Sequence, residues 1–300
     1  MRKLLLVALL VVLVVVLGAA IWWVGGFGSR SRGDFSGERA YDAVLAQMEI
    51  GPRITGTPGG LAAGDYIAEQ LRAAGWSTEF QPFTYFDTAG RNVIGQANVG
   101  AGPIIILGAH YDTRRRADQD LERPTDPVPG ANDGASGVAV LLELARTLDL
   151  DSVPYEIWLA FFDAEDNGRL DGWDWIIGSR YMADNLTVQP EAMILVDMIG
   201  DADQQLYLEG NSDPELQAAL WTTAAGLGYG QYFIPVLRFT MIDDHIPFKD
   251  RGIRAVDIID FDYPYWHTTA DTADKVSAAS LERVGRTLEA YLETEGEGDP

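Results

Sequence analysis

The sequence of 300 residues contains no cysteine and only three histidines. Without cysteine, the chain cannot form disulfides, use a thiolate nucleophile or build a cysteine-ligated zinc or iron–sulfur site. Any transition metal must therefore be held by histidine and carboxylate side chains. Basic residues are also scarce, with 22 Lys and Arg against 45 Asp and Glu and a net charge of −23. Because nucleic acids and anionic lipid surfaces attract basic proteins, this balance excludes general affinity for either.

The remaining composition is that of a folded protein. Apolar residues make up 47% of the chain, aromatic residues 10% and charged residues 22%. These proportions exclude a disordered or low-complexity chain. At roughly 150 residues per domain, the length allows one large domain or two small ones.

The N-terminus contains an uncharged apolar run from Leu4 to Val24. At 1.5 Å per residue, a helix of this length spans the roughly 30 Å hydrocarbon core of a bilayer. Arg2 and Lys3 precede the run and favour a cytoplasmic N-terminus, and Trp22 and Trp23 fit an interfacial aromatic belt. We therefore predict a single-pass signal anchor with the rest of the chain on the extracytoplasmic side. The alternative is a signal peptide that is cleaved, which would give a secreted protein.

The chain is thus expected to contain a cytoplasmic stub, a transmembrane anchor, a flexible linker, one folded domain and an acidic tail. These segments cover residues 1–3, 4–24, 25–33, 34–293 and 294–300.

Within the folded domain, hydrophobic periodicity predicts alternating helices and strands. The predicted helices are Asp34–Met48, Leu61–Ala74, Val138–Leu148, Pro214–Gly226 and Ser280–Glu293. The predicted strands are Ser77–Phe86, Ile104–Gly108, Tyr155–Phe162, Ala192–Val196 and Ala255–Ile259. This alternation predicts an α/β three-layer sandwich, in which helices flank a mostly parallel central sheet.

Histidines and carboxylates follow four of the predicted strands. In open α/β sheets, ligands bind beyond the carboxyl ends of the strands, so these side chains are expected at one edge. A further loop, 131–137, opens a helix between two of the strands and carries another carboxylate. The residues are His110, Asp112, Asp133, Asp163, Glu165, Asp166, Asp197 and His267.

Histidine and carboxylate ligands together are typical of a divalent-metal site and suit zinc. All three histidines of the chain, His110, His245 and His267, lie in these polar segments. Taken singly, each residue has a structural explanation as a turn former, a helix cap or a hydrogen-bonded loop residue. Four such coincidences at one edge of one sheet favour a metal site instead.

Seven segments occur in an order that resembles the zinc aminopeptidase and glutaminyl cyclase family. They are GAHYDT (108–113), ANDGASGVA (131–139), FFDAED (161–166), GSRYMA (178–183), LVDMIG (195–200), DDHIPF (243–248) and WHTTAD (266–271). The segment GPRITGTPGG (51–60) and the helix after it are similar to the N-terminal region of that family. The resemblance covers roughly residues 34–293 and implies the same α/β sandwich.

The resemblance implies a zinc site. Asp133, Asp166 and His267 would hold one zinc ion, and His110 and Asp197 would join Asp133 if a second were bound. The family usually has glutamate at the position of Asp166, and the shorter side chain leaves the metal count at one or two. Asp112 would orient the His110 ring, as carboxylates often do for ligating histidines.

The resemblance also implies catalytic roles and two competing reactions on peptide N-termini. Glu165 would be the general base. In an aminopeptidase, it would activate a zinc-bound water that attacks the first peptide bond. In a glutaminyl-peptide cyclotransferase, it would move a proton while the substrate's own amine attacks its glutamine side chain, and Asp197 and Asp243 would be further catalytic residues.

Details of the resemblance favour the cyclotransferase. Aminopeptidases more often have serine at the position of Asp243. Trp266 matches a tryptophan that lines the cyclotransferase pocket, and Trp173 and Trp175 lie where that branch places another pocket aromatic. We accordingly predict that Trp266 and Trp173 contact substrate. Besides the aminopeptidase, a non-catalytic peptide-binding module is the second alternative, and the sequence does not specify an oligomeric state.

Overall fold

The structure is a computed structural model that describes residues 34–294. The predicted stub, anchor and linker, and all but the first residue of the acidic tail, lie outside this range. No helix in the described part of the chain has the length and hydrophobicity needed to cross a bilayer.

The described residues form seven α-helices, one short 3-10 helix and eight strands. The helices are α2 (Gly37–Ile50), α3 (Pro58–Ala73), α4 (Ala135–Thr147), α5 (Ile177–Asp184), α6 (Pro214–Gly226), α7 (Ile246–Asp250) and α8 (Ala278–Thr294), with the 3-10 turn η1 at Ala273–Lys275. The strands are β1 (Ser77–Tyr85), β2 (Thr88–Ala97), β3 (Ile104–His110), β4 (Glu156–Phe162), β5 (Ala192–Asp197), β6 (Leu206–Glu209), β7 (Phe233–Phe239) and β8 (Arg254–Ile259).

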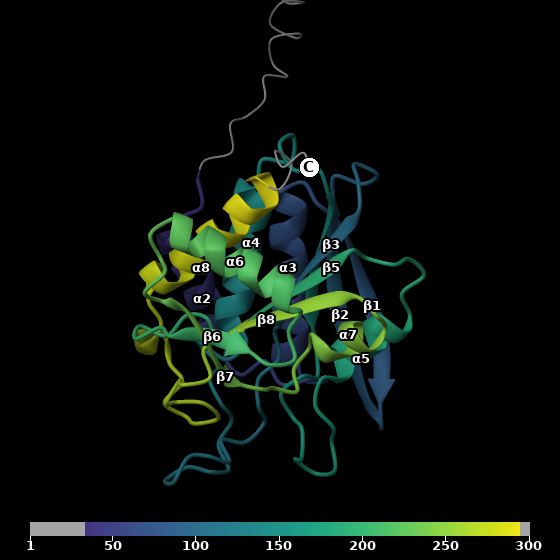
Figure 1. Cartoon of the computed structure of the whole chain (residues 1–300). Helices are drawn as coiled ribbons and strands as arrows, with labels where there is room; N and C mark the ends of the chain where they lie inside the picture. The colour runs from purple at the N-terminus through teal and green to yellow at the C-terminus, as the bar shows by residue number, and fades with distance from the viewer. Residues whose placement is uncertain (1–33, 295–300) are drawn as a thin grey trace, which may run out of the picture. The chain divides into compact units, whose positions relative to one another are not determined.

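The central sheet has six strands in the order β1-β2-β4-β3-β5-β8 (Figure 1). Strands β4, β3, β5 and β8 are parallel neighbours, whereas β2 runs antiparallel to both β1 and β4. Strands β6 and β7 form a separate two-stranded parallel sheet. The mixed sheet with a parallel centre confirms the predicted α/β class.

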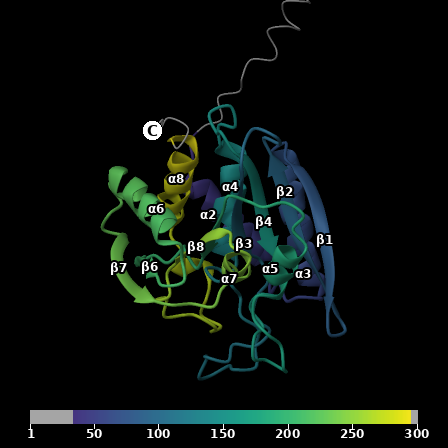
Figure 2. The ribbon, with the colours of Figure 1, turned by 45° about the vertical axis from the view of Figure 1, so that its right-hand side comes forward.

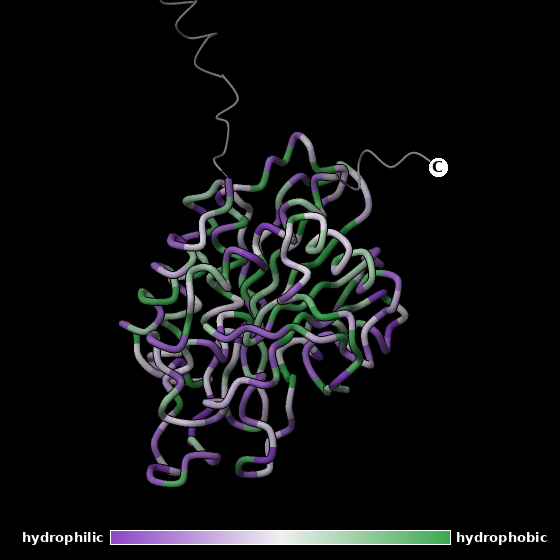
Figure 3. The backbone as a smooth tube through the Cα atoms, turned by 60° about the vertical axis from the view of Figure 1, so that its left-hand side comes forward, coloured by the Kyte–Doolittle hydropathy of each residue, from purple (hydrophilic) through white to green (hydrophobic). Residues whose placement is uncertain are grey.

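Helices cover both faces of the sheet, and alternate residues of β3 pack into different hydrophobic cores on the two faces. Ile105 and Leu107 pack into a large hydrophobic core that includes residues of α2, α3, α4 and α8. Ile106 points the other way, into a smaller core with Met182 of α5 and Phe248 of α7. Figure 2 shows α5 and α7 beside the sheet. Successive side chains of a strand point to opposite faces, so a strand buried on both sides is apolar throughout. Figure 3 shows the hydrophobic segments concentrated in the centre of the domain.

The predicted element boundaries agree with the structure to within a few residues, but several elements were not predicted. These are β2, β6, β7, α5 and α7. Strand β2 completes the antiparallel part of the central sheet, and α5 and α7 make up the second helical layer.

Candidate metal centre and active-site cavity

The predicted polar residues converge at the carboxyl ends of the parallel strands. His110 is the last residue of β3 and Asp197 is the last residue of β5. Asp166 lies four residues beyond the end of β4, and Asp133 lies just before α4. His267 comes from the loop after β8. Parallel strands end at the same edge, and this brings residues from distant parts of the sequence into one cluster.

The cluster consists of two triads that share Asp133. His110 Nε2 lies 3.1 Å from Asp133 Oδ1 and 3.2 Å from Asp197 Oδ1. On the other side of Asp133, His267 Nε2 lies 2.8 Å from Asp166 Oδ1 and 3.8 Å from Asp133 Oδ2. All five residues are buried, and within each triad the candidate ligand atoms lie within 4.8 Å of one another.

The donor atoms of this cluster fit a metal ion. Asp133 Oδ2 and Asp166 Oδ2 are buried without a hydrogen-bond partner. A buried polar atom left without a partner costs about 1–3 kcal/mol, and a cation would satisfy both oxygens. Burial, followed by the charge of Asp133, raises the pKa of Asp166 to about 6, which shows how poorly the protein alone stabilises this carboxylate. Two carboxylates and one imidazole form a typical ligand set for zinc.

Asp112 connects the two sides of the cluster. Its Oδ1 lies 3.7 Å from His110 Nδ1 and accepts a hydrogen bond of 2.9 Å from the backbone N–H of Glu165. Its Oδ2 accepts one of 3.3 Å from the N–H of Asp166. Asp112 therefore positions the turn that carries Glu165 and Asp166, and its carboxylate lies beside the His110 ring that it was predicted to orient.

Two positioning residues were not singled out from the sequence. Asp271 accepts hydrogen bonds from the backbone N–H groups of Asn132 and Asp133, at 2.9 and 3.1 Å, and from Tyr263 Oη at 2.6 Å. The fully buried Arg53 donates to three backbone carbonyls, including that of Gly130. Both residues fix the loop that presents Asp133, and both lie in segments on which the family resemblance was based.

The backbone beside the cluster adopts left-handed conformations at non-glycine residues. Ala164, Met198 and His267 have φ values of 61°, 45° and 56°. Such conformations are unfavourable for side chains with a Cβ atom and persist only where the surrounding structure enforces them. They follow three of the strand ends, where the chain turns sharply to present the cluster.

A cavity of about 320 Å³ opens onto the second triad. Asp133, Asp166 and His267 line it together with the three predicted catalytic carboxyl groups, Glu165, Asp197 and Asp243. Burial raises the pKa of Glu165 well above the usual range for glutamate. Burial and the nearby Asp257 and Asp197 raise the pKa of Asp243 in the same way. The cavity thus brings together carboxyl groups whose pKa values are raised by burial, a pattern that is common at active sites.

Two tryptophan rings that stack with the His267 ring form part of the cavity wall. Trp266 stacks on this ring with centroids 3.7 Å apart and an interplanar angle of 24°. Trp175 is also stacked with it, at 5.8 Å and 15°. Both tryptophans line the cavity, as predicted for Trp266.

Trp173, which was also predicted to contact substrate, is not among the residues that line this cavity. It packs in a small cluster with Phe83, Ala164 and Ile177, under the guanidinium of Arg115. Trp175, two residues later, takes the place at the cavity that was expected for Trp173.

The third histidine, His245, belongs to neither triad. Its Nε2 lies 3.4 Å from Glu209 Oε2, and its Nδ1 lies 3.9 Å from Asp257 Oδ2. It is fully buried, and it comes two residues after Asp243 in the sequence segment DDHIPF.

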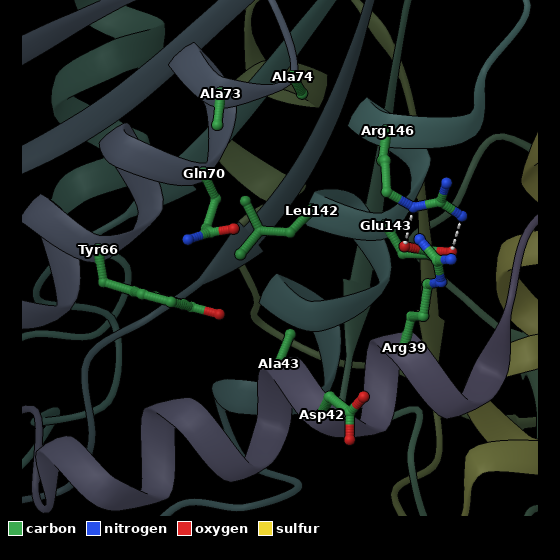
Figure 4. Close-up of a pocket in the computed structure, with 10 residues that line it drawn as sticks. All are labelled: Arg39, Asp42, Ala43, Tyr66, Gln70, Ala73, Ala74, Leu142, Glu143 and Arg146. Atoms are coloured by element: carbon green, nitrogen blue, oxygen red, sulfur yellow. Dashed lines mark hydrogen bonds and ion pairs between the residues drawn. The ribbon is translucent and has the colours of Figure 1, made fainter. Parts of the chain in front are cut away.

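A second cavity, of about 400 Å³, lies between α2, α3 and α4 (Figure 4). No histidine lines it, and its buried acid, Glu143, is bound by Arg146 at 2.6 and 2.8 Å. This second cavity therefore lacks the groups that mark the first one as the candidate active site.

Comparison with known proteins agrees with this site. The model of peptidase family M28 matches residues 92–292, a range that contains all five residues of the two triads. The chain belongs to peptidase family M28.

Relatives of this M28 protein include enzymes of both predicted branches. The structure of Porphyromonas gingivalis glutaminyl cyclase is 36% identical, with a TM-score of 0.82, covering 88% of this chain and 100% of that one. A leucine aminopeptidase precursor from Bacteroides thetaiotaomicron is 33% identical with a TM-score of 0.82, covering 87% and 98%. Among curated proteins, the glutaminyl-peptide cyclotransferase-like protein of Bos taurus is 27% identical over 87% of this chain and 76% of its own length.

Membership of M28 makes the protein a zinc-dependent enzyme that modifies peptide N-termini. This sets aside the alternative of a non-catalytic module and leaves two candidate reactions.

Proposed function

We propose that the protein is a glutaminyl-peptide cyclotransferase, which converts an N-terminal glutamine into pyroglutamate and releases ammonia. The observation that carries the proposal is the presence of Asp243 on the cavity wall with Glu165 and Asp197. These three carboxyl groups are additional to the carboxylates of the Asp133–Asp166–His267 triad. The 36% sequence identity to P. gingivalis glutaminyl cyclase, over 88% of this chain, supports the same reaction.

In this proposal, Asp133, Asp166 and His267 would hold one zinc ion. When bound, zinc supplies Lewis-acid polarisation of the substrate's side-chain carbonyl. The stacked rings of Trp266 and Trp175 keep the His267 side chain in place and cover the site with apolar surface. That surface helps to exclude water, which would otherwise compete with the substrate's own amine.

The proton transfers fall to Glu165. The α-amine nitrogen forms a bond to the side-chain carbonyl carbon, and Glu165 takes the proton that the amine loses. Glu165 then gives this proton to the amide nitrogen as the bond between carbon and nitrogen breaks, so that ammonia leaves and the proton count balances. Burial raises the pKa of Glu165, and this favours its accepting a proton before it gives the proton up again. Asp197 and Asp243 hydrogen-bond the reacting groups and hold them in line.

The aminopeptidase reaction is the second candidate because of the His110–Asp133–Asp197 triad. Its three residues could hold a second zinc ion, and a pair of metal ions would be suited to activating water. In the cyclotransferase, Asp197 is instead free to contact substrate.

Product masses distinguish the two reactions. Full-length protein in detergent, loaded with zinc, is incubated with one peptide that begins with glutamine and a matched one that begins with leucine. We expect loss of ammonia from the glutamine peptide alone. Release of the first amino acid from either peptide would instead identify an aminopeptidase.

The N-terminal anchor and the extracytoplasmic position of the active site, or secretion after cleavage, remain predictions from the sequence. Fractionation of cells that express the full chain, followed by protease treatment of intact cells, tests both.

A further inference from the structure

One basic residue stands out in the candidate active-site cavity. Arg169 is the sole arginine or lysine among the described residues that line it, and five carboxylic acids line the same cavity. Arg169 is exposed, as are Thr240 and Ile242 of the facing loop, whereas the triad residues are buried. The exposed lining residues mark the mouth of the cavity, and Arg169 therefore stands at its entrance.

Arg169 has no acidic partner within the part of the chain that the structure describes. The nearby arginines at 114–116 do have such partners: the first binds Asp118 at 2.6 Å, and the third binds Asp171 at 2.9 Å. An exposed guanidinium that lacks a partner retains its full capacity to bind a carboxylate from another molecule.

The backbone holds Arg169 in a defined position. Its φ of 64° lies in the left-handed region, and its N–H donates a 2.7 Å hydrogen bond to the carbonyl of Trp173. The preceding Gly168 has no room for a Cβ atom because the Trp175 ring lies against it. The segment is thus fixed between two tryptophans, one of which stacks on His267. A strained but fixed conformation at a binding site is often functional.

We propose that Arg169 selects peptides with an acidic residue directly after the N-terminal one. This inference rests on the proposed function, in which the first residue of the peptide fills the cavity. Consecutive Cα atoms are 3.8 Å apart, so the second residue lies where the chain leaves through the mouth. There, its side chain passes Arg169. The whole chain, at −23, repels acidic peptides at long range, and Arg169 offers a local attraction that offsets this repulsion.

The test compares three peptides that differ only in the second residue: Gln-Glu, Gln-Gln and Gln-Lys. An exposed ion pair contributes modestly, and the attraction of glutamate adds to the repulsion of lysine, so the wild-type kcat/KM ratio of Gln-Glu to Gln-Lys should be about tenfold. In Arg169→Gln, the ratio should fall toward one, and in Arg169→Glu it should invert. Arg180→Gln is the matched control, because Arg180 is an exposed arginine on α5 that does not line the cavity. It should keep the wild-type ratio.

A binding measurement separates failure of this inference from failure of the proposed function. The dissociation constants of the three peptides are measured by calorimetry with Glu165→Gln, alone and combined with Arg169→Gln. If wild type releases no ammonia but the charge preference in binding depends on Arg169, the proposed reaction is wrong and the selectivity stands. If ammonia is released, and Arg169→Gln changes neither the kcat/KM ratio nor the ratio of dissociation constants between the Gln-Glu and Gln-Lys peptides, the proposed selectivity is overturned.

Discussion

Asp133 is the residue on which the metal centre depends most. Its two carboxylate oxygens face different histidines, Oδ1 toward His110 and Oδ2 toward His267. Its backbone N–H is held by Asp271. Any change at this side chain therefore affects both triads, whereas a change at Asp166 or Asp197 affects one.

This arrangement predicts different zinc contents for two variants. Asp133→Asn should lose zinc altogether after dialysis, because each triad is left with two ligands at most. Asp197→Asn should retain one equivalent at Asp133, Asp166 and His267. Elemental analysis of the dialysed proteins checks both outcomes. If Asp133→Asn retained all of its zinc, Asp133 would not be a zinc ligand.

In the proposed reaction, Glu165 carries the proton and does not bind the metal. Glu165→Gln should lower kcat by at least about 10²–10⁴-fold, the usual contribution of a general acid–base residue, while zinc content stays at the wild-type level. Glu79→Gln, an exposed glutamate on β1, is the control for loss of one acidic charge. Turnover by Glu165→Gln at a rate near that of Glu79→Gln would show that the proton is carried by another group.

Trp175, and not Trp173, lies on the cavity wall, and the sequence could not predict which of the two would do so. The two tryptophans are two residues apart in an irregular loop, and Ile176, the next residue, has a φ of 58°. No helical or strand periodicity applies to such a loop, so the sequence cannot decide which ring faces the cavity. By contrast, His110 and Asp197 end apolar strands, and the rule for parallel sheets was enough to bring them together.

Among the elements, α4 lies unusually close to the sheet at its first turn. A Cβ atom on Gly137 would collide with the carbonyl oxygen of Val196 on β5, and it would lie 3.0 Å from the Cβ of Ala109 on β3. Glycine therefore lets the helix pack directly above the two strands that end in His110 and Asp197. The loop before α4 carries Asp133, so this close approach sets the spacing of the cluster.

Gly137→Ala should destabilise the fold by roughly 1–3 kcal/mol, the usual cost of forcing an extra methyl group into a packed interior. It should also weaken zinc binding, because α4 and Asp133 move away from the strand ends. The control is Gly226→Ala at the end of α6, where a Cβ atom meets nothing within 4 Å. Urea unfolding with and without zinc measures both effects. Equal stability of the two variants would show that α4 accommodates the methyl group without moving.

Most of the predicted strands were continuous apolar runs, and Ser77–Phe86 was predicted from its alternation. The missed strands β2 and β7 are interrupted by glycine, proline or polar residues. Strand β2 contains Gly90, Arg91 and Asn92, and the buried Asn92 is satisfied by the carbonyl of Gly178 and by Gln81. Strand β7 contains Pro235, which is normally confined to edge strands, and most of its side chains are exposed. The hydrogen bonds of Asn92 to distant residues and the tolerance of an edge strand for Pro235 depend on the folded structure. Neither can be seen in local hydrophobicity.

For the molecule as a whole, many of the acidic side chains are buried in the interior. Asp260, which belongs to neither triad, accepts a 2.7 Å hydrogen bond from the N–H of Gln205, and burial raises its pKa to about 7. In the unfolded chain, an aspartate loses its proton near pH 4. Between these pH values, the folded state binds more protons than the unfolded state, and the free energy of unfolding therefore falls as pH rises from about 4 to 7.

This linkage predicts a smaller pH dependence when Asp260 is made neutral. The free energy of unfolding of the wild type should be lower at pH 8 than at pH 5. In Asp260→Asn, the difference should shrink by about 1–3 kcal/mol, since each unit of pKa shift corresponds to about 1.4 kcal/mol. Urea unfolding at both pH values, with zinc removed by a chelator from both proteins, gives the comparison. An unchanged difference would show that Asp260 is already ionised in the folded protein at pH 5.

The candidate zinc ligands at the active-site cavity come from positions as far apart as 133 and 267, and no short segment contains a full triad. An unfolded or partly folded chain therefore cannot assemble the site, and tight zinc binding is linked to completion of the whole α/β domain. It follows that the zinc content of a preparation measures the fraction of its molecules that are folded. Titrating the metal release during unfolding would report the same transition as spectroscopy of the protein core.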